Sequence, residues 1–258
     1  MIETMTIIVA NWNNRIYLDD CFSSLANQTC KHFSVLFIDD CSDDGSFYYV
    51  LQEITSKFPS IKITVKQNGI NIGYTKTLIR GIDLAGTDIV GILDSDDALE
   101  PTAVEEIISY YAKYRDVGFV YTNFWYCNEN LERMKSGFCQ YVPPHKSNIL
   151  FNGVSHFKTF RKKLYKKTVG LDQNMLYGQD KDLSYKMEEV CQLKFIPKPL
   201  YLLRRGGKNS VHIDPKKYEM SKRYAEEAKS KAMKRRREYP KNIDPSMRRR
   251  MIELGYVA

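Results

Sequence analysis

Three aspartates directly follow a short apolar stretch in the segment Gly91–Asp97, whose sequence is GILDSDD. The apolar residues have the pattern of a buried strand, so Asp94, Asp96 and Asp97 fall on the first turn after it. Carboxylates two positions apart on a tight turn can converge on one point, where their repulsion is unfavourable unless a cation lies between them. A single aspartate would suffice to cap the helix that follows. The cluster therefore indicates either helix capping or a site for Mg²⁺ or Mn²⁺ with room for a phosphate.

The segments that would position this cluster alternate between strand and helix. Strand patterns lie at residues 6–10, 33–38, 61–65 and 88–93, and helical patterns lie between them at residues 18–25, 47–58 and 78–85. This alternation predicts an α/β fold whose mostly parallel central sheet carries helices on both faces. After Asp97 the pattern changes, which predicts a second, smaller lobe rather than more sheet. Short strands are expected there at residues 195–197 and 200–203.

Two other polar loops follow predicted strands. Asn11–Asn14 follows the first strand, and Asp39–Ser46 follows the second. In a parallel sheet, ligands bind at the carboxyl ends of the strands. We therefore expect both loops to share one edge of the sheet with Asp94, which favours a metal and nucleotide site over helix capping.

The composition is that of a soluble enzyme with an excess of basic residues. Of 258 residues, 43% are hydrophobic and 27% are charged, and the net charge is +8. No apolar run has the length of a membrane span and the first residues lack a signal-peptide pattern, so a cytoplasmic location is expected. The six cysteines lack the spacing of a zinc site, which predicts free thiols.

The segment from Pro215 onward is rich in Lys and Arg, and residues 218–237 are good helix formers. One interpretation is a solvated helix, and the other is a peripheral contact with anionic lipid headgroups or another anionic partner through residues 234–237 and 248–250. No nucleic-acid partner is expected. The residues that would pack the solvated helix are Tyr218, Ala225, Ala228 and Ala232.

Five stretches, in their order and spacing, resemble the family 2 inverting glycosyltransferases with the GT-A fold. They are TIIVANWNN, SLANQT, FSVLFIDDCSDDGS, NIGYTKTLIRGIDLAGTDIVGILDSDD and GLDQNMLYGQDKDL, within about residues 5 to 211. The resemblance implies a GT-A domain over residues 1–214, with a nucleotide-binding half at 1–100 and an acceptor-binding half at 101–214. A basic helical extension would follow at 215–258.

The resemblance also implies a nucleotide site. Asp39 would accept a hydrogen bond from the N–H of the base, usually uracil, although thymine presents the same N–H. Asp94 would approach the ribose or the water shell of the metal. The other positions implied to bind the nucleotide are Ala10, Asn11, Asn13, Asn71, Gly73, Lys76 and Ser95.

Metal and catalytic roles follow from the same resemblance. Asp96 would bind Mn²⁺ or Mg²⁺ directly, with Asp94 as a further metal contact and Asp97 supporting the loop. Asp180 would be the general base that takes the proton of the acceptor hydroxyl, and Asp182 is the alternative.

The chain departs from the family at one metal position. The family often has a metal-binding histidine where Gly206 stands, and His212 could replace it. The residues implied to contact the diphosphate are Arg204, Arg205 and Lys208.

The resemblance implies a metal-dependent inverting glycosyltransferase that moves a single sugar from a nucleotide-diphosphate sugar to a hydroxyl of a glycan or lipid-linked acceptor, and the donor is expected to be UDP-linked. Single-sugar transfer is expected because the sequence lacks a QxxRW motif. Acceptor contacts are expected from residues 152–156 and 160–161. The alternatives are a nucleotide-binding family member without catalysis, and a binding module that acts through the basic tail.

Overall fold

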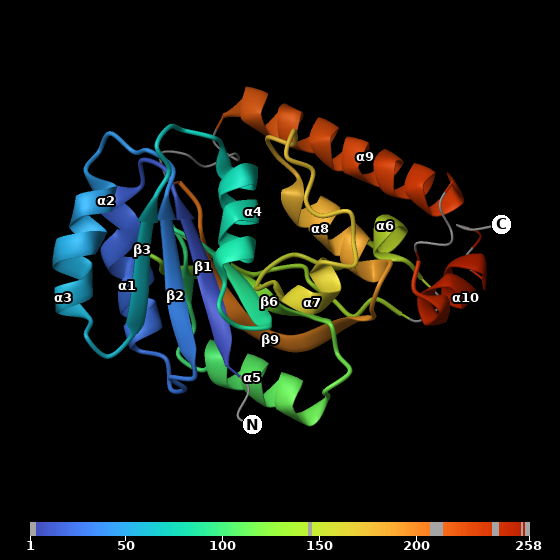
Figure 1. The fold of residues 1–258 in the computed structure, drawn as a ribbon, viewed down its shortest axis with the longest axis horizontal. Coiled ribbons are helices and arrows are strands. Elements are labelled where there is room, and N and C mark those ends of the chain that lie inside the picture. Colours follow the sequence, from blue (N-terminus) through green and yellow to red (C-terminus); the bar gives the residue numbers. More distant parts are fainter. Residues whose placement is uncertain (1–3, 144–145, 207–213, 239–242, 254, 256–258) are drawn as a thin grey trace.

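The computed structural model describes residues 4–143, 146–206, 214–238, 243–253 and 255. Its centre is one nine-stranded sheet in the order β3-β2-β1-β4-β8-β6-β9-β5, with β7 paired to β6 (Figure 1). The strands are β1 (Met5–Asn11), β2 (Phe33–Asp39), β3 (Lys62–Gln67), β4 (Ile89–Asp94), β5 (Ala98–Leu99), β6 (Phe119–Cys127), β7 (Arg133–Ser136), β8 (Thr159–Arg161) and β9 (Leu193–Arg204). The helices are η1 (Arg15–Tyr17), α1 (Leu18–Ala26), α2 (Ser46–Tyr48), η2 (Tyr49–Ile54), α3 (Thr55–Lys57), α4 (Tyr74–Leu84), α5 (Ala103–Lys113), α6 (Asn148–Phe151), α7 (Lys162–Tyr165), α8 (Gln179–Glu188), α9 (Pro215–Glu238) and α10 (Pro245–Glu253).

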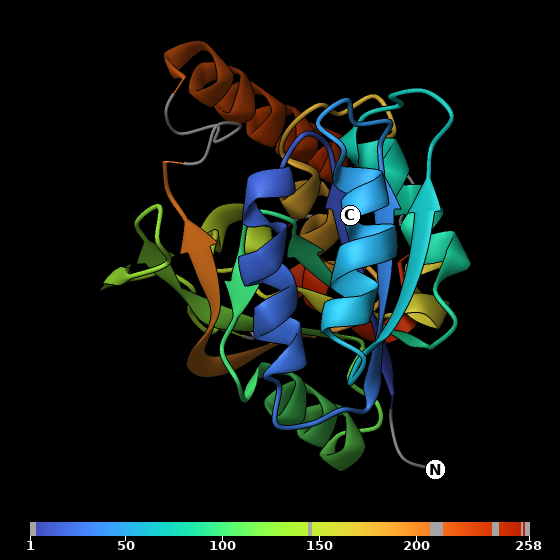
Figure 2. The same ribbon diagram turned by 90° about the vertical axis from the view of Figure 1, so that its left-hand side faces the viewer.

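The first four strands are parallel and carry helices on both faces, as the sequence predicts. Neighbouring side chains of a strand point to opposite faces. The ring of Phe37 on β2 therefore lies 5.9 Å from that of Phe22 on α1, whereas the next residue, Ile38, lies under α4. A Cβ at Gly81 of α4 would lie 2.7 Å from Ile8, so glycine allows this helix to approach the sheet closely. Figure 2 shows α1, α2 and α3 in front of the strands.

The strands that follow Asp97 belong to the same sheet, so the expectation that no more sheet follows was wrong. β8 pairs antiparallel with β4, and the parallel pair β6 and β9 extends the sheet further. The two short strands expected at 195–197 and 200–203 are one strand, β9. Its register shifts at Pro197 and Pro199, because proline has no N–H to donate to the neighbouring strand. The division into nucleotide-binding and acceptor-binding halves stays a prediction.

The C-terminal helices pack on the rest of the chain through a second, smaller apolar cluster. Helix α9 lies along α8 in both views (Figures 1 and 2). Ala228 and Ala232 of α9 are fully buried in this cluster, together with Tyr185 of α8 and Met251 of α10. The predicted packed helix is confirmed at the two alanines, whereas Tyr218 is 42% exposed and does not contribute to the packing as expected.

The thiols are unpaired. All six cysteines are free, as the sequence predicts, and four of them are buried. Among the helices that the structure describes, none combines the length and the apolar character needed to cross a bilayer.

Candidate functional site

The polar loops meet at one edge of the sheet, as expected from the sequence. β1 lies between β2 and β4, so the carboxyl ends of these three strands are adjacent. The side-chain amide of Asn11 donates to Asp39 Oδ1 at 2.9 Å, and the N–H of Asn13 donates to a serine hydroxyl of the loop after β2 at 2.9 Å. On the other side, Asn14 donates to Ser95 Oγ at 3.1 Å. The loop after β1 thus connects residues 39–46 after β2, called the nucleoside loop for its predicted ligand, to residues 94–97 after β4, called the aspartate loop.

Two tyrosines hold two of the three aspartates. Tyr201 of β9 donates its hydroxyl to Asp97 Oδ2 at 2.7 Å and lies 3.4 Å from Asp94, and Tyr74 of α4 donates to the other oxygen of Asp94. Burial and the nearby carboxylates raise the pKa of both tyrosines well above its ordinary value, so their hydroxyls stay protonated and can donate. Sequence reasoning missed both, because no local motif connects them to the aspartates.

Arg204, at the end of β9, braces the same loop. Its backbone N–H donates to Asp97 Oδ1 at 2.7 Å, its Nε donates to the carbonyl of Asp96 at 2.6 Å, and its guanidinium pairs with Asp20 at 2.8 Å. The residue is 5% exposed. A diphosphate would have to replace one of these bonds, so the predicted diphosphate contact stays a prediction, while the bracing role is a feature that the sequence did not reveal.

Asp96 is the member of the cluster to which no described side chain donates. It is half-buried, and burial together with the charge of Asp94 raises the pKa of Asp96 to about 6. A nearby cation would favour its ionised form. Mg²⁺ in enzymes is commonly bound by one or two carboxylates together with substrate phosphates and water. The donor set therefore fits such a cation, with Asp96 as the ligand and Asp94 beside it.

Within the described part of the chain, no group of three or more His, Cys, Asp or Glu side chains is arranged to hold a metal ion. A cation at Asp96 would therefore take further ligands from substrate and water, or from residues outside that part. The predicted third ligand, His212, and the predicted diphosphate contact, Lys208, both lie outside the described residues.

The nucleoside loop is tightly hydrogen-bonded. Asp39 is fully buried and accepts bonds from Asn11, from the hydroxyl and N–H of Ser42 at 2.6 and 2.9 Å, and from Gln67 at 3.2 Å. A base N–H could reach Asp39 by replacing Gln67, the longest of these bonds. Asn11 Oδ1, by contrast, is buried without a hydrogen-bond partner, and it is an acceptor that a nucleoside could use. Ala10 is 4% exposed, and the nucleotide contacts of these residues stay predictions.

Asp40 shapes the loop that precedes α4. It accepts the backbone N–H groups of Ile72 at 2.9 Å and Gly73 at 2.8 Å. Gly73 has φ +88°, a conformation that residues with a side chain rarely adopt. Asn71 and Lys76 are exposed on either side of it, so their side chains are accessible to a ligand, as the prediction of nucleotide contact requires.

The two carboxylates considered as the base differ in their surroundings. Asp180 lies in the first turn of α8, half-buried, and no described residue donates a hydrogen bond to its carboxylate. Asp182 is 2% exposed and accepts bonds from Lys186 Nζ at 2.7 Å and from the N–H of Asp172 at 2.9 Å. Asp182 is therefore held in a buried ion pair, which leaves Asp180 as the accessible carboxylate.

Helix α9 packs against the turn that carries Asp180. Gly178, the residue before α8, has φ +74°, and a Cβ there would lie 3.2 Å from backbone atoms of Tyr224 and Ala225 of α9. The ring of Tyr177 lies 6.0 Å from that of Tyr224. The position of the turn therefore depends on the C-terminal helix.

The backbone at the end of β9 favours glycine at position 206, where the resemblance implies a metal-binding histidine. Gly206 has φ +102°, and a Cβ there would lie 2.8 Å from Glu129, so this backbone disfavours a larger residue. The neighbouring Arg205 stacks over Tyr126 at 4.3 Å, and its Nε is buried without a partner. This unused donor is consistent with the predicted diphosphate contact of Arg205, which stays a prediction.

Part of the basic tail is directed into the protein. Arg235 makes a bidentate pair with Glu189 at 2.6 and 2.8 Å. Arg236 is fully buried and donates to Glu188 at 3.1 Å and to Ser147 at 3.0 Å. The proposed lipid contact was expected to use both arginines, and in this structure they are not available for it.

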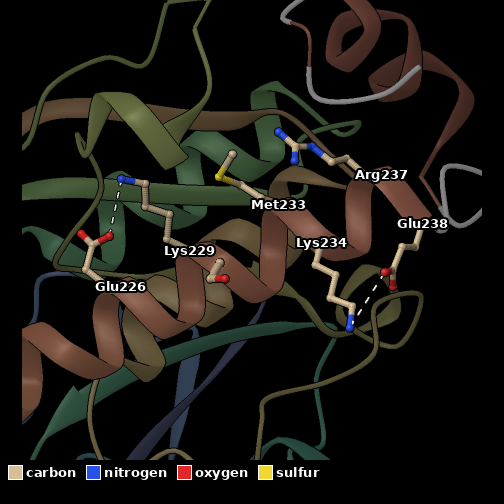
Figure 3. Close-up of a pocket in the computed structure, with 7 residues that line it drawn as sticks. Glu226, Lys229, Met233, Lys234, Arg237 and Glu238 are labelled. Carbon is tan, nitrogen blue, oxygen red and sulfur yellow. Dashed lines mark ion pairs between the residues drawn. The ribbon is translucent and has the colours of Figure 1, made fainter.

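Figure 3 shows a surface hollow whose described lining residues all belong to α9. Lys229 pairs with Glu226 at 3.6 Å, and Lys234 pairs with Glu238 at 3.9 Å. The hollow therefore carries both signs of charge, and it contains none of the predicted site residues. A membrane contact by the remaining basic residues stays a prediction.

Comparison with protein families gives a match over most of the chain. A family model described as Glycosyl transferase family 2 matches residues 6–181. Among curated proteins, chondroitin synthase of Escherichia coli is 28% identical over 214 residues, which cover 81% of this chain and 30% of that protein. Hyaluronan synthase of Pasteurella multocida is 26% identical over 211 residues, which cover 81% of this chain and 21% of that protein. The chain thus spans less than a third of the length of these relatives.

Solved structures share the fold. S. aureus TarS 1-349 in complex with UDP-GlcNAc superposes with a TM-score of 0.74 at 17% identity, covering 97% of this chain and 70% of that one. A mannosyltransferase of Pyrobaculum calidifontis in complex with GDP-Man and Mn²⁺ gives a TM-score of 0.60 at 13% identity, covering 98% and 84%. At these low identities, the superpositions show a shared fold alone.

Proposed function

The chain belongs to glycosyl transferase family 2, and on that premise we propose that it transfers one sugar, with inversion, from a UDP-linked donor to a hydroxyl of a glycan or lipid-linked acceptor. The observation that carries this proposal is the contrast within the aspartate cluster. Asp94 and Asp97 are held by Tyr74, Tyr201 and Arg204, whereas Asp96 has no side-chain partner among the described residues. A cluster built to leave one carboxylate available beside a nucleoside loop suits a cation and a diphosphate.

Nucleotide binding would use the edge formed by β1, β2 and β4. The free oxygen of Asn11 and the carboxylate of Asp39 are acceptors for a base N–H, while Lys76 and Arg205 are cations within the predicted nucleotide and diphosphate contacts. A bound Mn²⁺ or Mg²⁺ would offset the negative charge that develops on the leaving diphosphate. The UDP and UDP-GlcNAc complexes of TarS support the choice of a uracil nucleotide.

Asp180 would act on the acceptor. Inversion by direct displacement needs one base on the face of the sugar opposite the leaving group, and a carboxylate suffices. Asp180 carries no hydrogen bond from a described residue, so its oxygens can accept the proton of an acceptor hydroxyl. The turn at Gly178 and helix α9 would keep it in place.

The test is a transfer assay on the full chain. UDP-, dTDP-, GDP- and CDP-sugars are incubated with Mn²⁺ and a panel of glycan and lipid-linked acceptors, and the anomeric configuration of the product is read by NMR. We expect transfer from a UDP-sugar with a product of the opposite anomeric configuration. Retention of configuration would contradict the proposed role of Asp180.

The same assay addresses the non-catalytic alternative. A family member that binds nucleotide without catalysis would bind UDP and Mn²⁺ but would release no sugar with any donor. If neither binding nor transfer were found, the sheet edge would not be a nucleotide site. No observation in the structure favours a binding module based on the basic tail, because Arg235 and Arg236 are paired inside the protein.

A further inference from the structure

Two lysines, the buried Lys158 and the half-buried Lys181 that follows Asp180 in the chain, have no carboxylate partner among the described residues. Lys158 is 5% exposed, and its hydrogen-bond partner is Nδ1 of His156 at 3.3 Å. Lys181 donates to the carbonyl of Val154 at 3.2 Å and to the side chain of Asn152. Within the described residues, no carboxylate oxygen lies within 4.0 Å of either Nζ.

The ammonium group of Lys181 is influenced by the charges around it. Burial lowers the pKa of Lys181, the charge of Asp180 raises it, and the charge of Lys158 lowers it. Both lysines contact the same short segment, because Lys181 Nζ donates to the carbonyl of Val154 and Lys158 Nζ lies at hydrogen-bond distance from His156, two residues further on. A buried cation without a paired anion is unfavourable, and two that repel each other are more so. An anion supplied from outside the chain would remove this cost.

The lysines lie beside the predicted site. The ring of His156 stacks on that of Tyr201 with centroids 4.5 Å apart and planes at 19°, and Tyr201 holds Asp97. Phe138, which is 48% exposed, lies under Lys181 with its ring centroid 5.9 Å from Nζ. The pair is thus connected by direct contacts both to the aspartate loop and to the turn that carries the predicted base.

We propose that Lys158 and Lys181 form a subsite for an anionic group, a carboxylate or a phosphate, on the acceptor. This proposal rests on the proposed function, because the role of Asp180 places the acceptor hydroxyl next to Lys181. The diphosphate of the donor belongs instead at Asp96, in the aspartate cluster. A bound oxyanion would accept hydrogen bonds from both ammonium groups, and hydrogen bonds between charged groups are stronger than those between neutral ones.

The test compares anionic and neutral probes on the full chain in the presence of UDP and Mg²⁺. Methyl glucuronide is compared with methyl glucoside, and glucose 6-phosphate with glucose, by saturation-transfer NMR titration. We expect at least one anionic probe to bind about tenfold more tightly than its neutral counterpart, which is the effect of one such hydrogen bond. The pair that shows the larger preference distinguishes a carboxylate from a phosphate.

Variants assign the preference to the two lysines. Lys158→Met and Lys181→Met keep the aliphatic stem and remove the charge, so each should abolish the preference. Lys167→Met, an exposed lysine after α7, is the control and should keep it. If Lys158→Met does not fold, the comparison of Lys181→Met with the wild type still tests whether the subsite binds an anion. UDP titration of each variant reports separately on the donor site.

Three results would contradict the proposal of an anionic subsite at these lysines. The wild type could bind neutral and anionic probes equally, or both lysine variants could keep the preference. Alternatively, the preference could appear between UDP-glucuronic acid and UDP-glucose and be absent among acceptors, which would place the anion on the transferred sugar. Failure of the wild type to bind UDP would refute the proposed function instead, while the preference for anionic probes would still be measurable.

Discussion

The hydroxyl of Tyr201 donates to Asp97 Oδ2 at 2.7 Å, across 104 positions of the sequence. Both residues are at most 2% exposed, so this bond fixes the aspartate loop to strand β9 inside the protein. Burial and the charges of Asp96 and Asp94 raise the pKa of Asp97 well above its ordinary value, and the bond from Tyr201 opposes that effect. The aspartate loop is therefore held in place by the half of the chain that follows it.

Replacing Tyr201 by Phe should weaken both the loop and its ligands. The change removes one donor from a buried carboxylate, which costs about 1–3 kcal/mol of unfolding free energy, and it should lower the affinity for UDP with Mn²⁺. Denaturant unfolding and calorimetric titration measure the two effects. Tyr110→Phe is the control, because the half-buried Tyr110 packs against Tyr114 with its ring centroid 4.8 Å away and donates to no aspartate among the described residues. Equal losses in the two variants would contradict the bracing role.

Asp180→Asn should lose transfer activity, whereas Asp182→Asn should lose stability. Asp180→Asn removes the proposed base while keeping its shape, so transfer should fall by about a hundredfold or more with unchanged melting temperature and UDP affinity. Asp182→Asn breaks a buried ion pair with Lys186, which should cost about 3–5 kcal/mol of unfolding free energy. Transfer rates and denaturant unfolding on both variants separate the roles. Full transfer activity in Asp180→Asn would refute its assignment as the base.

The effect of Mn²⁺ should depend on pH through Asp96. Its pKa in the folded protein is raised to about 6, whereas an unfolded Asp has a pKa of about 3.9, so the folded state binds more protons between these values. The metal-free protein therefore loses stability from this group as pH rises through about 4 to 6. Because a cation binds the ionised carboxylate, the gain in melting temperature from Mn²⁺ and UDP should be small near pH 5 and grow toward pH 7. Asp96→Asn should show no such growth, and the same pH dependence in that variant would contradict the assignment.

Arg236→Met and Arg237→Met should separate the inward and outward basic residues of α9. Arg236 is fully buried against Glu188, so its removal leaves an unpaired buried charge and should cost about 3–5 kcal/mol of unfolding free energy. Arg237 is exposed, so its removal should change the free energy by less than about 0.5 kcal/mol. Denaturant unfolding compares the two, and effects of the same size would argue against the buried network.

Much of the fold follows from local patterns in the sequence. The strands at the start of the chain are β-branched apolar runs between helical segments, and this alternation predicts their parallel order and the shared edge of the Asn11, Asp39 and Asp94 loops. The later strands are harder to predict, because β8 has only three residues and β9 contains two prolines. β8 is too short to be identified as a strand, and the prolines of β9 interrupt its pattern, so that this long strand has the pattern of two short ones.

The part of the site that lies within one sequence motif, the aspartates at residues 94–97, was predictable from the sequence. Asp94, Asp96 and Asp97 are close in sequence, and their crowding follows from their spacing. Asp94 and Asp97 differ from Asp96 because they accept hydrogen bonds from Tyr74, Tyr201 and Arg204. Tertiary packing brings these three partners to the aspartates. The buried position of Arg236, which has the composition of a surface residue, depends in the same way on the helix that α9 packs against.

The most direct test of a metal-assisted nucleotide site is calorimetric titration of UDP into the full chain, with Mn²⁺ and with EDTA, for wild type and Asp96→Asn. Asp116→Asn, an exposed aspartate after α5, is the matched control. We expect UDP to bind wild type and control only with Mn²⁺, and Asp96→Asn to lose at least about tenfold in affinity, equivalent to about 1.4 kcal/mol. Equal affinity for UDP in EDTA, or in Asp96→Asn with Mn²⁺, would contradict a metal-assisted nucleotide site.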